Sequence, residues 1–134
     1  MIRQWDEYTA GPTKPRDERL HVTLNQKGVI FLNRKMHEVL GRPAAAILLF
    51  DRRNGLIGIR PANAKHAFPL KKKSVGTGRI IHASPFCRHH GMTIDRPIVF
   101  HNPDLEDDGT LMLNLETATH IGRKRANRAG TRGK

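Results

Sequence analysis

The stretch GVIFLNRKMHEVLG, Gly28 to Gly41, contains the signals for a strand, a helix start and a helix end. The apolar run VIFL predicts a strand, and Asn33 is a residue type that caps helix N-termini. The segment RKMHEVL predicts a two-turn helix with Met36, Val39 and Leu40 facing inward, and the closing glycine ends it.

The same order of elements returns 50 residues later in GRIIHASPFCRHHG, Gly78 to Gly91. Ser84 and Pro85 are predicted to supply the helix cap and the first helical position. Phe86 stands 50 residues after Met36, as Gly91 does after Gly41. Because order, spacing and element type agree, we interpret the chain as an internal duplication of one small unit.

Working outward, RLHVTLNQKG alternates in hydropathy, which predicts a half-buried strand before Gly28. After the first helix, AAAILLFD and LIGIRP predict a hairpin turned by Asn54-Gly55. After the second helix, RPIVFHNPDLEDDGTLMLNLE predicts a hairpin with a longer loop. A unit of about 40 residues is too small to bury its own sheet face, so the two copies are expected to pack together.

These elements predict an α+β, β-rich fold. Two β-α-β-β repeats would pack about a pseudo-two-fold axis, with a flexible N-terminal arm and a basic C-terminal tail. The expected boundaries are a flexible arm 1–19, repeat 1 at 20–61, a basic linker 62–75, repeat 2 at 76–116 and a disordered basic tail 117–134.

The composition indicates a soluble, reduced protein. The chain has 134 residues, 37% of them hydrophobic, and no apolar run approaches the roughly 20 residues of a membrane span. The N-terminus does not resemble a signal peptide, and the single Cys87 cannot form an internal disulfide. We expect a cytoplasmic, nucleoid-associated location.

Positive charge is the strongest global feature, with 24 Lys and Arg against 12 Asp and Glu. The excess is +5 over 20–61, +4 over 62–75 and +6 over 121–134, whereas 76–120 carries −3. This segregation indicates a polyanionic partner, because solubility alone would not require it.

The repeated unit resembles the swapped-hairpin domain of the AbrB, MazE and MraZ families. The resemblance covers about residues 20–116 and rests on Gly28, VIFL, Leu40-Gly41 and AILLFD…LIGIRP, then on Gly78-Arg79, Ile80-Ile81, Ser84-Pro85 and Gly91. Two copies in one chain look most like MraZ, which implies that the two repeats form a swapped-hairpin barrel. The resemblance also implies that this pseudo-dimer can assemble further as a homo-oligomer. The resemblance also implies DNA contacts from basic residues on one face of the paired sheet.

Basic side chains at the ends of the predicted strands and helices are the candidate nucleic-acid-binding residues, since guanidinium and ammonium groups there can reach phosphates or a guanine edge. The tail IGRKRANRAGTRGK would add phosphate contacts without sequence specificity. The candidate residues are Lys27, Arg34, Lys35, Arg42, Arg52, Arg53, Lys71, Lys72, Lys73, Arg79, Arg123, Lys124, Arg125 and Arg128.

Other chemistries fit less well. Cys87 and His90 share a helix face, with His82 and His101 on neighbouring strands, but the paired spacing of a zinc site is absent. The loop NPDLEDDG fits a charged hairpin tip, and a surface for another subunit's basic face, better than an EF-hand, because position twelve is Leu115. We therefore expect no metal or cofactor.

The leading hypothesis is a non-enzymatic, DNA-binding transcriptional regulator that binds through a basic face of repeat 1 and the basic tail. The first alternative is an RNA-binding or structural ribonucleoprotein component. The second is an antitoxin-like protein that covers a protein partner with its basic C-terminal arm. A histidine-dependent nuclease using His89 or His90 is a fourth, weaker interpretation.

Overall fold

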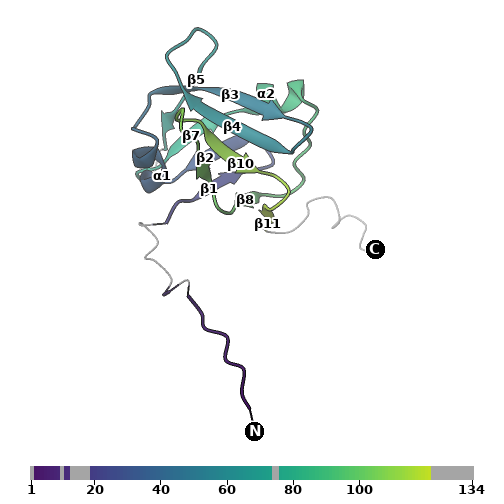
Figure 1. The fold of residues 1–134 in the computed structure, drawn as a ribbon. Helices are drawn as coiled ribbons and strands as arrows, with labels where there is room; N and C mark the ends of the chain where they lie inside the picture. The colour runs from purple at the N-terminus through teal and green to yellow at the C-terminus, as the bar shows by residue number, and fades with distance from the viewer. Residues whose placement is uncertain (1, 10, 13–18, 74–75, 122–134) are drawn as a thin grey trace, which may run out of the picture.

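A computed structural model of the chain describes residues 2–9, 11–12, 19–73 and 76–121. Its strands form two antiparallel sheets, which lie one above the other in Figure 1. Sheet A contains, in spatial order, β11 (Thr119–His120), β8 (Ile98–Phe100), β1 (Val22–Leu24), β2 (Val29–Leu32), β7 (Arg79–His82) and β6 (Lys71–Lys72). Sheet B contains β5 (Phe68–Pro69), β3 (Ala45–Asp51), β4 (Leu56–Pro61), β10 (Leu111–Asn114) and β9 (Asp104–Leu105).

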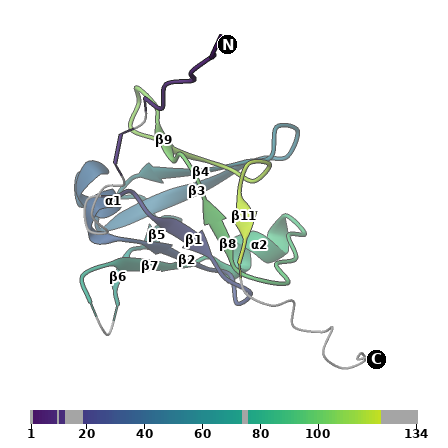
Figure 2. The same ribbon diagram turned by 90° about the horizontal axis from the view of Figure 1, so that it is seen from below.

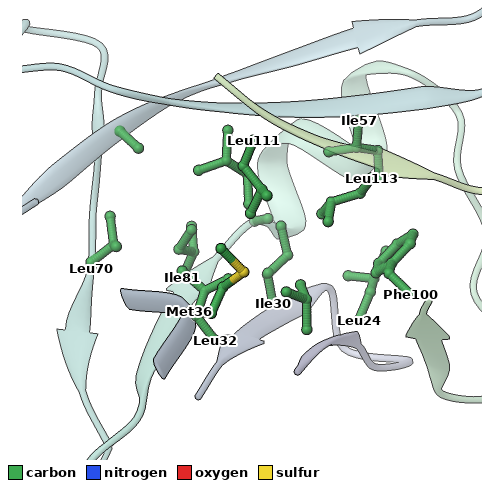
Figure 3. Packing of buried hydrophobic residues seen from close by; sticks show 14 of the residues in the cluster. Leu24, Ile30, Leu32, Met36, Ile57, Leu70, Ile81, Phe100, Leu111 and Leu113 are labelled. Atoms are coloured by element: carbon green, nitrogen blue, oxygen red, sulfur yellow. The ribbon is translucent and has the colours of Figure 1, made fainter. Parts of the chain in front are cut away.

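The hydrophobic core lies between the two sheets. Side chains alternate along each strand, so one face of each sheet is apolar and meets the other sheet. Leu24 and Ile30 of sheet A point toward Ile57 and Leu113 of sheet B, and all four are 0 or 1% exposed (Figure 3). Fully burying one such side chain stabilises the fold by about 1.5–3 kcal/mol.

Two short helices lie at opposite ends of the sheets (Figure 1): α1 (Arg34–Val39) and α2 (Ser84–His89). The predicted cap of α1 is confirmed, because Asn33 Oδ1 accepts a hydrogen bond from the Met36 amide at 3.0 Å. The predicted cap of α2 was wrong, although the helix itself is present. Ala83 occupies the cap position, and Ser84 lies inside the helix, where its Oγ accepts a hydrogen bond from Arg88.

The inward face of α1 differs from the prediction at one position. Met36 and Leu40 are buried as expected, but Val39 is 39% exposed and His37 is buried instead. The His37 ring can turn inward because its Nε2 lies 3.0 Å from the Pro43 carbonyl oxygen, which satisfies the polar atom.

Residues 68–72 do more than link the two halves. Phe68–Pro69 pairs with β3 in sheet B, and Lys71–Lys72 pairs with β7 in sheet A. Leu70 lies between these two pairs and is buried in the core. This segment therefore passes from the edge of one sheet to the edge of the other, as Figure 2 shows for β5 and β6.

Across the described residues the strands form these two sheets and no closed barrel, so the predicted barrel is wrong. The outermost strands β5, β6, β9 and β11 have two residues each and pair only within their own sheet. Strands this short leave too few backbone groups to join the sheet edges. The described part of the chain also contains no helix long and apolar enough to cross a membrane.

The terminal segments differ in part from the expectation. Residues 2–9 and 11–12 form neither helix nor strand, consistent with an arm. Thr119 and His120, placed within the predicted disordered tail, form β11 and pair with β8. The rest of that tail, from residue 122 onward, lies outside the described residues.

Candidate nucleic-acid interface

The outer face of sheet A carries a row of side chains that points away from the core. Backbone pairing joins Ile80 to Phe31, Phe31 to Thr23, and Thr23 to Val99 across four adjacent strands. Phe31, Thr23 and Val99 are each partly exposed between two buried neighbours, and Ile80 is partly exposed beside the buried Ile81, as strand alternation predicts. Lys71 extends the row at one end because it pairs with Ile80.

This row forms the floor of an open groove of about 1450 Å³, which we call the sheet A groove. Figure 2 views the molecule from the side of this sheet. The residues that line it combine four basic side chains, two histidines, three asparagines and an apolar floor. Among the described residues that line it there is no aspartate or glutamate. The basic members are Arg19, Arg34, Lys35 and Lys73.

Phe31 lies at the centre of the groove. The Lys73 ammonium lies 4.5 Å from the centroid of its ring, within cation–π distance. The His21 ring meets it edge to face at 6.1 Å. Its ring also lies against the backbone of Gly78, where a side chain would collide with it. The floor is therefore an ordered aromatic platform with a cation beside it.

The first turn of α1 supplies two of the basic residues. Arg34 Nη1 donates to Glu38 Oε2 at 2.7 Å, and the Arg42 guanidinium lies 3.4 Å from the same oxygen. The hydrogen bond from Arg34 is the main reason why the pKa of Glu38 lies below its usual value. Glu38 thus holds Arg34 in place but compensates part of its charge, while Lys35 lies beside it in the groove lining.

Asn33 connects the helix start to the chain that enters the groove. Besides capping α1, its Oδ1 accepts a hydrogen bond from the His21 amide at 3.2 Å. Its Nδ2 donates to the Arg19 carbonyl oxygen at 2.6 Å. One side chain therefore positions both Arg19 and the α1 basic residues at the same rim of the groove.

The structure brings only some of the predicted site residues together. Arg34, Lys35 and Lys73 line the groove, and Lys71 continues its row. Lys27 lies in the turn between β1 and β2, next to lining residues Asn25 and Val29. The remaining described candidates do not line it: Arg42, Arg52, Arg53, Lys72 and Arg79. The tail candidates Arg123, Lys124, Arg125 and Arg128 lie outside the described residues.

Several groove residues were missed from the sequence, notably Arg19, His21, Asn25 and Phe31. The alternation in RLHVTLNQKG contained a usable signal. If the core face holds Val22 and Leu24, the intervening residues must face outward. Nothing local indicated that Lys73 would lie over Phe31, because the two are 42 positions apart and meet only through the β2–β7–β6 pairing.

The Arg52 side chain contacts other residues of the fold and does not project freely from the hairpin tip. Its Nη2 donates to the His90 carbonyl oxygen at 2.8 Å, at the end of α2. Its guanidinium also lies 5.4 Å from the Phe50 ring centroid. Desolvation, followed by the charges of His89 and Arg52, lowers the pKa of His90 below its usual value. Arg52 thus connects the β3–β4 turn to α2.

Arg52→Gln is expected to lower the free energy of unfolding by about 1 kcal/mol, because it removes a hydrogen bond and a cation–π contact near the surface. Arg53→Gln, its exposed neighbour, is the matched control with the same charge change and an expected effect below about 0.5 kcal/mol. Urea unfolding followed by circular dichroism measures both. Equal stability of the two variants would contradict this role of Arg52.

The cysteine and histidine candidates are not arranged as a metal site. Within the described part of the chain, no group of three or more His, Cys, Asp and Glu side chains could hold an ion. Cys87 is buried, and burial raises the pKa of its thiol. His101 Nε2 lies 2.6 Å from Thr119 Oγ1, a contact that connects β8 to β11.

The acidic loop fits a charged hairpin tip. Asp108 Oδ1 accepts a hydrogen bond from the Thr110 amide at 2.9 Å, and this bond is the main cause of its lowered pKa. Asp104, Glu106 and Asp107 are exposed. This loop belongs to sheet B, whereas the groove with its four basic residues lies on the outer face of sheet A.

Comparison of the chain with models of known protein families, with curated proteins and with solved structures gave no match.

Proposed function

We propose that this chain is a DNA-binding transcriptional regulator of the AbrB/MraZ-like kind, with the sheet A groove as its nucleic-acid interface. The observation that carries the proposal is the composition of the groove. Four basic side chains line it, and the lining residues that are described include no acidic one. Basic residues that gather on one sheet face are the electrostatic footprint of a polyanion site.

The strand pairing supports the duplicated swapped-hairpin layout as part of this proposal. Strands β2 and β7, 50 residues apart, pair with each other at the centre of sheet A. Strands β4 and β10, from the two predicted hairpins, pair in sheet B. The pairing of β1 with β2 also has a counterpart in that of β6 with β7, on the other side of the central pair. This pattern is what an approximate two-fold relation between repeats would produce.

On this proposal, the rim of the groove binds phosphates, which fixes the position of the duplex. The turn between β1 and β2 lies beside the groove and bears Lys27. A two-stranded ribbon of this kind is narrow enough for the major groove, where lysine can contact guanine. The basic tail follows β11 at the edge of sheet A, from where it would add phosphate contacts.

Single-stranded RNA is a second candidate, favoured by Phe31. Proteins that bind single strands combine a basic groove with an aromatic side chain on which a base stacks. Phe31 is half-buried on the floor of such a groove, with Lys73 beside it. Stacking there would require the Lys73 ammonium to move aside toward a phosphate.

Fluorescence-anisotropy titrations of the full chain and of residues 1–121 distinguish these functions. Labelled duplex DNA, single-stranded RNA and folded RNA are titrated across a salt series with unlabelled random DNA as competitor. A regulator is expected to prefer duplex in both forms of the protein, with a shallower dependence of log affinity on log salt in the truncated form. Preference for the single strand would support the second candidate, and loss of all binding on truncation would overturn both.

A further inference from the structure

The N-terminal segment presents unusually exposed apolar side chains. Ile2, Trp5 and Tyr8 are 92%, 86% and 77% exposed. Trp5 and Tyr8 are also the only tryptophan and the only tyrosine of the chain. These residue types are enriched among the side chains that dominate binding energy at interfaces. We call residues 2–9 the aromatic arm.

The charges of the aromatic arm complement those of the sheet A groove. Asp6 and Glu7 lie between its two aromatic side chains, in the order Trp-Asp-Glu-Tyr. Arg3, whose guanidinium lies 6.0 Å from the Trp5 ring centroid, leaves the arm a net charge of −1. The groove has the opposite arrangement: an apolar floor around Phe31 and a rim with four basic residues. Its lining, as far as the structure describes it, contributes no carboxylate that would repel the arm. Aromatic side chains could therefore meet the floor while the two carboxylates face the rim.

The arm is also connected to the rim of this groove. Arg19 and Leu20 line it, and Asn33 fixes their position through the Arg19 carbonyl and the His21 amide. Tyr8 precedes Arg19 by 11 residues, which can span up to about 35 Å. A short tether gives an effective concentration on the order of 1 mM, far above what a second molecule would reach in dilute solution.

We propose that the aromatic arm docks in cis on the sheet A groove, with Trp5 against the apolar floor around Phe31 and with Asp6 and Glu7 facing the basic rim. The arm in the structure is the open form of this equilibrium. Because the docked arm covers the basic rim, nucleic acid must displace it. This displacement, unlike the docking itself, rests on the function proposed above.

Trp5 makes the docking directly measurable, since all tryptophan fluorescence of the chain comes from the arm. Acrylamide quenching of the full chain is compared with that of a peptide of residues 1–12. At low salt, we expect the quenching constant of the full chain to be smaller by about twofold or more, the value for an arm docked half of the time. Quenching equal to that of the peptide would overturn the proposal.

A matched pair of variants tests the charge complementarity. Asp6→Asn with Glu7→Gln is expected to restore the quenching of the free peptide, as is salt at about 1 M. Glu106→Gln with Asp107→Asn removes the same charge from the exposed loop of sheet B and should leave the protection of Trp5 unchanged. Equal effects of the two pairs would overturn docking on the groove. Protection that rises with protein concentration would overturn docking in cis and indicate exchange between molecules.

Deletion of residues 2–9 measures the competition. We expect the shortened chain to bind nucleic acid about 3- to 10-fold more tightly at low salt, for a local dissociation constant of about 0.1–0.5 mM. An unchanged affinity would overturn displacement. If no nucleic acid binds any form of the chain, the proposed function fails, yet the quenching experiment still decides whether the arm docks.

Discussion

Gly28→Ala is expected to lower the free energy of unfolding by about 4 kcal/mol. Gly28 has φ of +78°, a left-handed conformation that costs an alanine about 1–2 kcal/mol. In addition, a Cβ atom at this position would lie 2.8 Å from the Ser84 Cα, a backbone atom that cannot rotate away. Such overpacking costs about 1–3 kcal/mol. For a domain of this size, the sum corresponds to a fall in Tm of about 20 °C.

The site matters because it joins the two predicted repeats. The Ala83 amide donates to the Gly28 carbonyl oxygen at 2.8 Å, so the start of α2 lies directly on the β1–β2 turn. Gly91→Ala is the matched control, because Gly91 has φ of +69° but a Cβ atom there would meet nothing within 4 Å. It should cost about 1–2 kcal/mol. If thermal unfolding shows the same loss for both variants, the close contact between Gly28 and Ser84 is wrong.

The elements predicted from the sequence hold where local chemistry decides the structure. Asn33 caps α1, Gly41 follows its end with φ of +91°, and Gly55 takes φ of +67° in the predicted turn. Apolar alternation likewise predicted that Val22 and Leu24 form the buried face of β1.

The predictions fail where a contact outside the predicted element determines the structure. Residues 68–72 were predicted as part of a linker, but burial of Leu70 in the core places them in both sheets. The Pro43 carbonyl oxygen satisfies the His37 ring, so His37 is buried where Val39 was predicted to be.

For the candidate site, too, local sequence indicated some residues, whereas tertiary contacts determined which of them come together. Charge segregation directed attention to Arg34, Lys35 and Lys73, which line the groove, because composition alone reveals an excess of cations. It could not tell these residues from Arg52, whose partner His90 is 38 positions away. The face of a sheet on which a cation lies depends on strand order. That order places β6 beside β7 and thereby brings Lys73 over Phe31.

Neutralising the groove is expected to abolish most binding to duplex DNA. The groove variant replaces four basic residues with glutamine: Arg19, Arg34, Lys35 and Lys73. Each phosphate contact raises affinity by about eightfold at 0.1 M salt relative to 1 M, through counterion release. If the four side chains each bind one phosphate, affinity at 0.1 M should fall by about 4 × 10³-fold. The slope of log affinity against log salt should become shallower by about 3 to 4.

A control variant separates the groove from net charge. It replaces four exposed basic residues that do not line the groove with glutamine: Arg53, Arg60, Lys65 and Arg88. Both variants lose the same formal charge, so non-specific attraction falls equally, but the control should keep the salt slope within about 1 of the original. Circular dichroism melts establish that both are folded, since glutamine keeps much of each apolar stem. Equal losses of affinity and slope in the two variants would mean that the groove is not the interface.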